Sequence, residues 1–264
     1  MPLRMTLREA LAAADRPLFG SWINSGSPLV AEIVAGSGLD WVLIDAEHGP
    51  NDVPSVLAQL QAIAAYPVTA VVRPPIGETA IIKQYLDLGA QNLLVPMVDT
   101  AEHAEELVRA VRYPPRGVRG VGSSLARAAR WNRVDGYLAD ADRHVSLTVQ
   151  IESATAVANV EQIVAVDGVD AIFLGPADLA ASMGFLGDQA HPDVVATVER
   201  CLAVAKAAGK GAGVNAFVPE SADRYVAAGA DLVCVGADVT LLARGSEALA
   251  KRFIGDDGTQ RAGY

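Results

Sequence analysis

Four segments of the chain share one pattern, and this pattern constrains the fold more than any other property of the sequence. They are GSGLDWVLID (residues 36–45), DLGAQNLLVP (87–96), VDGVDAIFLGP (166–176) and AAGADLVCVGA (227–237). In each, a glycine suited to a helix end is followed within a few residues by a continuous apolar run, which is typical of a strand buried on both faces. The sequence therefore predicts a helix-to-strand connection that occurs four times.

Further strands are predicted between these segments, at residues 18–23, 68–73, 146–151 and 211–217. Helical patterns separate the strands, at residues 53–65, 79–88, 101–111, 156–166 and 194–208. Eight strands alternating with helices, without a Pro-, Ser- or charge-rich linker, predict a single α/β domain over residues 1–264, folded as a (β/α)8 TIM barrel. An open doubly wound sheet is the alternative, but the glycine-rich dinucleotide motif is absent after the first strand. About residues 255–264 are expected to form a disordered polar tail.

Composition narrows the possible partners. A net charge of −10 and an isoelectric point near 4.8 argue against nucleic acid and against anionic membrane surfaces. No apolar run reaches the roughly 18 residues of a membrane helix, and the N-terminus carries charges where a signal peptide is apolar, so we expect a cytoplasmic protein. Because 51% of the residues are hydrophobic, we also expect partner subunits to cover part of the surface.

In such a barrel, catalytic residues follow the carboxyl ends of the strands. Glu152 in VQIES and Asp178 in FLGPADL follow two neighbouring strands, which lie about 5 Å apart in a sheet. Two close carboxylates repel each other unless a proton or a cation lies between them, and Mg²⁺ or Mn²⁺ binds such a pair readily. The alternative is that both side chains cap helix N-termini.

Other polar residues occur at the same predicted edge. Arg73 in VVRPP is placed to bind a carboxylate or a developing enolate oxygen, or else to form an ion pair with Asp45 or Glu47. His48, in VLIDAEHGP, is the only histidine at a predicted strand end, and it has either a structural role or that of a general base oriented by Asp87.

Two further segments have ambiguous roles. The turn formed by Gly175, Pro176 and Ala177 exposes backbone N–H groups at a helix start, where an anion can bind, although many barrels have such turns. The arginine-rich segment of residues 113–143 is too long for an ordinary connection. It lies either near the substrate or a subunit interface, or on the surface as a solvated loop.

The motifs WVLIDAEHGP, VVRPP, IKQYLDLGAQNLLVPMV, RYPPRGVRGVGSSLARAARW, VQIES, FLGPADLAASMG and VGADVTLLARG together resemble the HpcH/HpaI family of metal-dependent class II pyruvate aldolases. The similarity is greatest to its 4-hydroxy-2-oxoheptane-1,7-dioate aldolase branch, also called hydroxyketoacid aldolases. It extends from about Phe19 to Phe253. It implies reversible cleavage of 4-hydroxy-2-oxo acids to pyruvate and an aldehyde, through a metal-stabilised pyruvate enolate.

The resemblance also implies roles for the candidate residues. Glu152 and Asp178 would ligate a divalent metal ion (Mg²⁺, Mn²⁺ or Co²⁺), which pyruvate would chelate, and Arg73 would stabilise the enolate oxygen. The remaining residues would position ligands, hold the pyruvate carboxylate or serve in acid–base chemistry. They are Gln150 beside the metal, the turn Gly175, Pro176 and Ala177 at the carboxylate, and His48 paired with Asp87 and supported by Asp45 and Glu47.

Substrate choice and assembly are less constrained. Trp22 and Ser124 are expected to contact the aldehyde, and Asn215 or Phe217 could contribute at a subunit boundary. The family implies a homohexamer, a dimer of trimers, in which the last helix (residues 238–253) is swapped between subunits. The alternatives are a 2-keto-3-deoxy sugar-acid aldolase, an acyl-CoA ester lyase of the citryl-CoA or malyl-CoA type, and a silent barrel that serves as an assembly subunit. No lysine lies at a strand end for a Schiff base.

Overall fold

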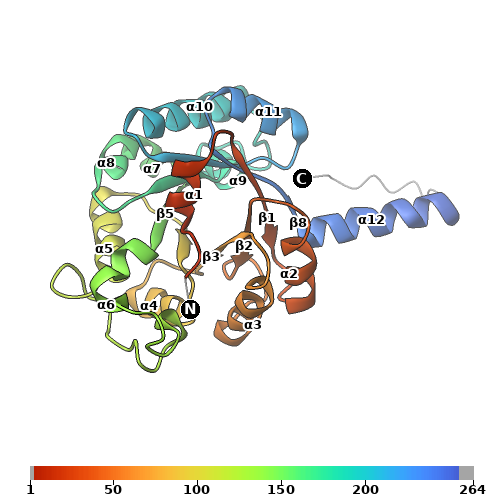
Figure 1. Cartoon of the computed structure of the whole chain (residues 1–264). Helices are drawn as coiled ribbons and strands as arrows, with labels where there is room; N and C mark the ends of the chain where they lie inside the picture. The colour runs from red at the N-terminus through yellow and green to blue at the C-terminus, as the bar shows by residue number, and fades with distance from the viewer. Residues whose placement is uncertain (1–2, 256–264) are drawn as a thin grey trace.

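The computed structural model describes residues 3–255 and contains a closed barrel of eight parallel strands in the order β1 to β8. The strands run along the barrel and are surrounded by helices (Figure 1). They are β1 (Leu18–Ile23), β2 (Trp41–Asp45), β3 (Thr69–Arg73), β4 (Asn92–Val95), β5 (Ser146–Ile151), β6 (Ala171–Leu174), β7 (Gly211–Asn215) and β8 (Leu232–Ala237). The (β/α)8 barrel predicted from the repeated pattern is confirmed.

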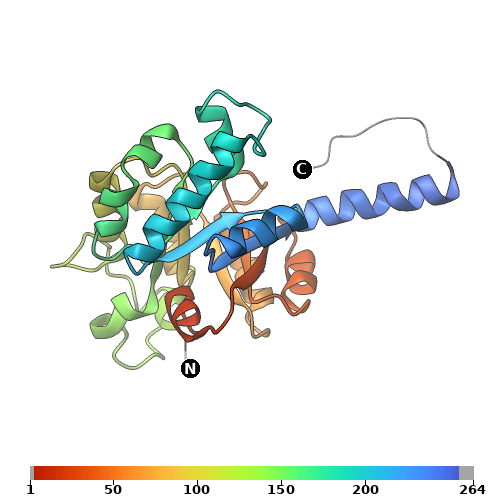
Figure 2. The same ribbon diagram turned by 90° about the horizontal axis from the view of Figure 1, so that it is seen from above.

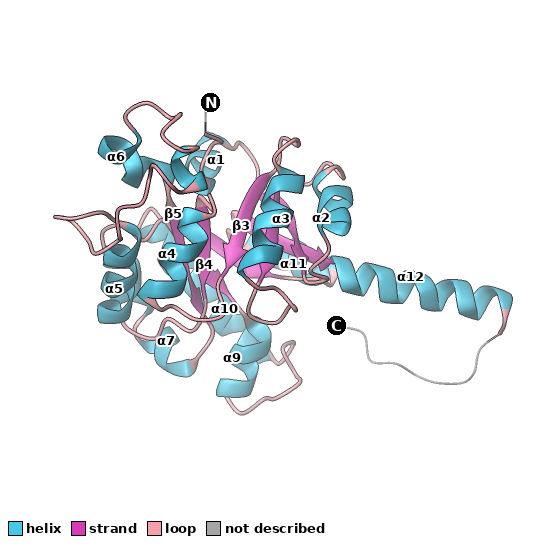
Figure 3. Ribbon diagram, turned by 90° about the horizontal axis from the view of Figure 1, so that it is seen from below, coloured by secondary structure: helices cyan, strands magenta, loops and turns pink. Residues whose placement is uncertain are grey.

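Helices connect successive strands and cover the outside of the barrel, as Figure 3 shows from below. They are α1 (Leu7–Ala13), α2 (Pro28–Ala35), α3 (Val53–Ile63), α4 (Thr79–Asp87), α5 (Ala101–Val111), α6 (Tyr137–Asp140), α7 (Ala154–Ala158), α8 (Val160–Ala165), α9 (Pro176–Ser182), α10 (Pro192–Ala207), α11 (Pro219–Ala227) and α12 (Asp238–Phe253). The single helix predicted at residues 156–166 is instead two helices that meet at Asn159, whose side-chain amide donates to the Asp99 carbonyl.

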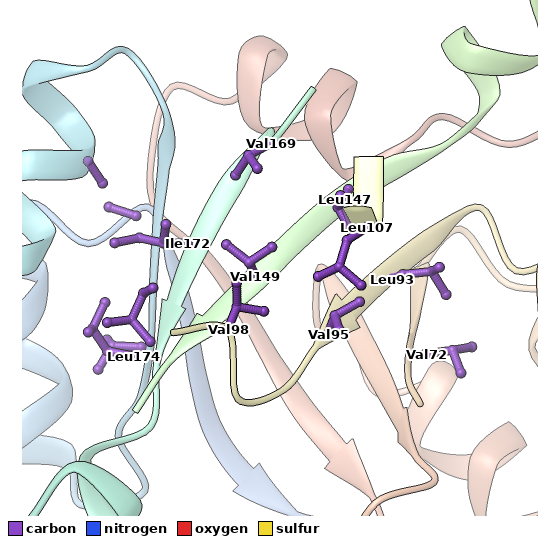
Figure 4. Close-up of a cluster of buried hydrophobic side chains, with 14 of the residues drawn as sticks. Val72, Leu93, Val95, Val98, Leu107, Leu147, Val149, Val169, Ile172 and Leu174 are labelled. Carbon is purple, nitrogen blue, oxygen red and sulfur yellow. The ribbon is translucent and has the colours of Figure 1, made fainter. Parts of the chain in front are cut away.

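Two apolar layers hold the barrel together. The larger one lies between the strands and the helices, where side chains such as Val149, Ile172 and Leu174 are fully buried (Figure 4). The smaller one fills the barrel interior, where Trp41 and Phe173 meet edge to face with ring centroids 6.2 Å apart. Because strand residues face these layers alternately, most strands are apolar on both faces, which explains the continuous runs in the sequence. β5 is an exception, since Ser146, Thr148 and Gln150 are buried on one face and Leu147, Val149 and Ile151 on the other.

The last helix departs from the packing of the others. α12 begins at β8 and projects from the barrel with most of its length unsupported (Figure 2). Large apolar side chains along it are exposed, among them Leu241 at 65%, Leu242 at 70% and Phe253 at 74%. None of the helices in residues 3–255 is long and apolar enough to cross a membrane. The tail expected to be disordered lies outside the described residues, apart from Gly255.

Candidate functional site

The carboxyl ends of the strands enclose a pocket of about 490 Å³. This volume suits a small ligand, and in barrels of this kind the carboxyl ends are where reactive groups gather. The pocket is lined by many of the candidate side chains and by several others. The lining consists of Trp22, Asn24, Asp45, His48, Arg73, Gln150, Phe173, Gly175, Pro176, Ala177, Asp178, Asn215, Phe217, Ala237, Val239 and Thr240.

A buried ion pair forms one wall. Asp45 ends β2 and pairs in register with Arg73 at the end of β3, so neighbouring strands bring the two side chains together. The Nε and Nη2 of Arg73 donate to Asp45 at 2.9 and 2.8 Å, and its Nη1 lies 2.7 Å from Oε2 of Glu47. Arg73 is 5% exposed and Asp45 is fully buried. The ion-pair alternative for Arg73 is therefore confirmed, and the pairing fixes the guanidinium at the pocket.

Arg73 is also held from its other face. Its guanidinium carbon lies 4.1 Å from the centroid of the Trp22 ring, a cation–π contact. The indole N–H of Trp22 donates to the Asn215 side chain at 2.9 Å, and Phe173 meets the ring edge to face. Trp22 thus orients Arg73 as well as lining the pocket. Asn24, which was not singled out from the sequence, donates to Asp45 at 2.6 Å and completes this corner.

Burial and charge act against each other at Asp45. Burial alone would raise the pKa of Asp45, but the hydrogen bonds and the charge of Arg73 outweigh it and hold that pKa below its usual value. The pKa of Glu47 is raised, mainly by burial, with Arg73 and His48 opposing the rise. Asp45 is thus a fixed anion, whereas Glu47 keeps an affinity for protons or cations.

The carboxylate pair predicted to bind metal occupies the next corner. β5 pairs with β6, so Glu152, one residue past β5, lies near the start of α9 and Asp178. Burial raises the pKa of Glu152 to about 7, and the charges of Asp178 and Glu47 add to the rise while the backbone N–H of Met97 opposes it. Uncompensated negative charge at this corner favours a cation.

The alternative that these carboxylates cap helices is wrong. The N-cap of α7 is Ser153, not Glu152, and Ser153 accepts from the Ala156 N–H. α9 has Gly175 at its N-cap, and no side chain caps this helix. Neither carboxylate therefore serves as a helix cap.

Glu152 has a defined orientation. Its Oε1 accepts from the Met97 N–H at 2.7 Å, and its Oε2 accepts from the Gln150 amide. A Cβ at position 175 would lie 2.9 Å from both the Gln150 Nε2 and the Glu152 Oε2, so Gly175 permits this close approach. Met97 has a φ of 55°, an uncommon conformation for a residue other than glycine, and its contribution could not be read from the sequence pattern.

The donor set fits a divalent cation that takes part of its coordination from elsewhere. No group of three or more His, Cys, Asp or Glu side chains arranged for metal binding occurs within residues 3–255. Two carboxylates beside a pocket leave coordination positions for a chelating ligand and for water, as hard divalent ions require. Glu152 and Asp178 could hold such an ion as a pair of carboxylates, with the other positions filled by a ligand and water.

His48 lies at the rim of the pocket, with its side chain 64% exposed and its Nε2 3.8 Å from Oε2 of Glu47. The expected pairing with Asp87 is not formed within one chain. Asp87 ends α4, which runs back from the carboxyl ends of the strands toward their amino ends, so the two residues lie at opposite ends of the barrel. There the Asp87 carboxylate lies 3.8 Å from Nη2 of Arg119.

Ser124 is not brought to the pocket either. It is exposed on the segment that follows α5 and is absent from the pocket lining. This segment packs beside α4 through its short helical turn at residues 127–129, away from the carboxyl ends of the strands. The position of so long a connection is set by tertiary packing, which the sequence pattern does not reveal.

Comparisons with known proteins agree with the fold and identify the family. The sequence profile of the family described as HpcH/HpaI aldolase/citrate lyase matches residues 18–245. The hydroxypyruvate/pyruvate aldolase of Deinococcus radiodurans is 56% identical over 96% of this chain and 91% of its own length. The 4-hydroxy-2-oxo-heptane-1,7-dioate aldolase of Salmonella arizonae is 51% identical over 95% of each chain.

Solved structures lead to the same assignment. A crystal structure of an HpcH/HpaI aldolase/citrate lyase family protein from Burkholderia cenocepacia J2315 superposes with a TM-score of 0.89 at 43% identity, covering 93% of this chain and 98% of that one. The resemblance inferred from the sequence motifs is thereby confirmed. The chain is an aldolase, a carbon–carbon lyase, and belongs to the HpcH/HpaI aldolase/citrate lyase family.

Proposed function

We propose that this enzyme reversibly cleaves 4-hydroxy-2-oxo acids to pyruvate and an aldehyde, and that Glu152 and Asp178 hold the divalent metal ion that the reaction requires. The observation that carries the proposal is the buried Glu152, whose pKa is raised to about 7 and whose carboxylate accepts from Gln150, next to a pocket lined by Gln150, Asp178 and a fixed Arg73. The names of the Deinococcus and Salmonella relatives support pyruvate as the shared product.

The chemistry follows from where negative charge develops. A bound divalent ion supplies a Lewis acid next to a chelating 2-oxo acid. Arg73 places its guanidinium, held by Asp45 and Trp22, where the oxygen of the enolate gains charge. Because both partners of Arg73 are buried, the guanidinium needs little reorganisation during the reaction.

The turn at the start of α9 binds the carboxylate of the oxo acid. Gly175, Pro176 and Ala177 line the pocket beside Gln150. Pro176 has no N–H and the Gly175 N–H donates to the Ile151 carbonyl, so the N–H groups without a helical partner at this turn are those of Ala177 and Asp178. Gln150, whose amide donates to Glu152 and whose Oε1 lies 3.4 Å from Nη1 of Arg73, links the two corners. It thereby keeps Glu152 and Arg73 in fixed relative positions.

Proton transfer is assigned to the pocket rim. In cleavage, His48 takes the proton of the C4 hydroxyl, and the C3–C4 bond then breaks to leave the aldehyde and the enolate of pyruvate. The exposed imidazole is accessible to a substrate that enters the pocket, and its Nε2 lies 3.8 Å from Oε2 of Glu47. Trp22 and Phe217 line the pocket, and we expect them to contact the aldehyde part of the substrate.

The test is an aldol assay with pyruvate and a short aldehyde, in which formation of the aldol product is measured. We expect no product after treatment with EDTA, and recovery when Mn²⁺ or Mg²⁺ is added back, because the proposed site depends on the metal. An acyl-CoA ester of the citryl or malyl type is the control substrate. Cleavage of that ester without aldol turnover would contradict the proposal, and so would full aldol activity in EDTA.

The unsupported α12 favours an oligomer, and we propose that it packs on a neighbouring subunit of a homohexamer. Leu242 and Phe253 are 70% and 74% exposed on this helix. The helix α2 lies beside the start of α12 (Figure 1), and its Leu29 and Ile33 are also exposed. Such area is usually covered in a soluble assembly.

A paired substitution in α12 tests this packing. Leu242→Ser combined with Phe253→Ser is expected to lower the mass measured by light scattering from that of a hexamer toward smaller species. Thr240→Ser in the same helix is a matched control that leaves its apolar face unchanged. A hexamer mass in both variants would show that α12 does not carry the interface.

A further inference from the structure

A second cavity lies at the opposite end of the barrel from the candidate site. It is a groove of about 1300 Å³, lined by α1, by the connections that lead into β2 and β3, and by two arginines of the 113–143 segment. We call it the basal groove. Apolar side chains form much of its wall, including Met5, Ala13 and Leu39. None of the residues assigned a role in the proposed aldol reaction lines this groove.

Positive charge gathers at one end of the basal groove. Arg127 and Arg130 line both the groove and a small recess of about 60 Å³ that continues from it, and Arg4 joins them there. Within the described part of the chain, no carboxylate lies within 4.0 Å of Arg127, Arg130 or Arg4. By contrast, Arg16 along the same groove is paired with Asp40 at 2.8 Å.

The two inner arginines are both partly desolvated and close to each other. Burial, with the charge of Arg130 adding to it, lowers the pKa of Arg127 to about 10. Burial also lowers the pKa of Arg130. The lowered pKa values mean that the protein environment disfavours the charged forms of Arg127 and Arg130. An anion bound between the two guanidinium groups would offset this unfavourable free energy.

Hydrogen bonds to backbone carbonyl groups hold the side chains of Arg127 and Arg130 in place. Arg127 donates to the Leu88 carbonyl at the end of α4 at 2.8 Å, and Arg130 donates to the Arg127 carbonyl at 2.6 Å. These bonds fix both side chains. The bond to Leu88 also places the positive charge of Arg127 at the C-terminal end of α4, where the helix dipole is negative. Carbonyl groups carry no net charge, so these hydrogen bonds leave the positive charges of Arg127 and Arg130 without a neighbouring carboxylate among residues 3–255. Such a pair of arginines is unusual in a chain with a net charge of −10.

We propose that the basal groove binds an amphipathic organic anion, whose carboxylate or phosphoryl head contacts Arg127 and Arg130 and whose apolar body lies along α1 and Leu39. The head group is specified by the two guanidinium groups, which pair with oxyanions. The body is specified by the apolar wall, which is continuous with the charged end. A bare inorganic anion would leave that wall exposed to water.

The experiment is a calorimetric titration of the full-length protein with octanoate, with acetate, inorganic phosphate and octylamine as comparison probes. We expect saturable binding of octanoate, and no comparable binding of acetate, which lacks the apolar body, or of octylamine, which carries the opposite charge. Octyl phosphate compared with octanoate shows which head group binds more tightly. Equal binding of inorganic phosphate and octanoate would overturn the proposal in favour of a simple oxyanion site.

Variants locate the site. Arg130→Gln is expected to weaken octanoate binding about tenfold, the effect of losing one charge-assisted contact. Ala13→Glu, which adds a carboxylate to the exposed wall of the groove, is expected to weaken it further. Arg143→Gln, in an 81% exposed arginine of the same segment, is the matched control and should bind as wild type does. Unchanged binding in both groove variants, or no saturable binding of octanoate to wild type, would overturn the proposal.

Discussion

Replacing Arg73 with lysine is expected to lower kcat for aldol cleavage by about 10²- to 10³-fold, the usual effect of removing one preorganised donor from a developing oxyanion. Lysine keeps the charge but cannot reproduce the two bonds to Asp45 together with the contact to Glu47. It also loses the flat contact with the Trp22 ring. The measurement is steady-state kinetics with saturating metal.

Arg8→Lys is the matched control for this substitution. Arg8 forms a partly exposed ion pair with Asp170 at 3.2 Å, away from the pocket, so its replacement should leave kcat unchanged. Because Asp45 is fully buried, Arg73→Lys should also lower the melting temperature, which must be measured so that kinetics are compared on folded protein. A kcat within threefold of wild type for folded Arg73→Lys would show that Arg73 is only a structural partner of Asp45.

Replacing Glu152 with glutamine is expected to abolish metal-dependent turnover, because an amide oxygen is a much weaker ligand for a hard divalent ion than a carboxylate. The substitution keeps the shape of the side chain beside Gln150 and Gly175. Glu161→Gln, on the surface helix α8, is the control. Turnover of Glu152→Gln at the wild-type rate would exclude Glu152 as a ligand.

The pH dependence has a defined sign. In the metal-free protein, burial raises the pKa of Glu152 to about 7 from 4.5, so the native state holds a proton there that the unfolded state releases between these values. Glu152 therefore contributes stability to the metal-free protein below pH 4.5, and this contribution is lost as the pH rises through about 7.

Denaturation in EDTA checks this sign. The free energy of unfolding of Glu152→Gln should increase relative to wild type as the pH rises over that interval, because glutamine does not lose a proton. Metal affinity of the wild type should rise over the same interval, since the metal displaces the proton. A constant difference between the two proteins at every pH would contradict this assignment.

Much of the fold could be predicted because local signals and the barrel topology agree. The predicted bounds of β1 and α5 coincide with those observed, since a run of apolar residues ends clearly in the first and an amphipathic pattern ends clearly in the second. The strand ends also located Arg73, Glu152 and Asp178 correctly at one face, because parallel strands in register bring their carboxyl ends together.

The failures concern positions set by long-range packing. The resemblance implies that Asp87 pairs with His48, but the direction of α4 places the two residues at opposite ends of the barrel within one chain. Arg119, within the arginine-rich segment, is fully buried between Tyr113 and Tyr137, so the solvated-loop alternative does not hold for this side chain. Met97 contributes a backbone N–H, which has no side-chain signature in a sequence.

A calorimetric titration of the metal-free protein with Mn²⁺, with and without pyruvate, tests the central assignment most directly. We predict one Mn²⁺ per chain, bound more tightly when pyruvate is present, because two protein carboxylates leave positions for a chelating ligand. We also predict that Glu152→Gln and Asp178→Asn each lose this binding. Binding of Mn²⁺ to both folded variants with the wild-type affinity would contradict the assignment of the pair as the metal site.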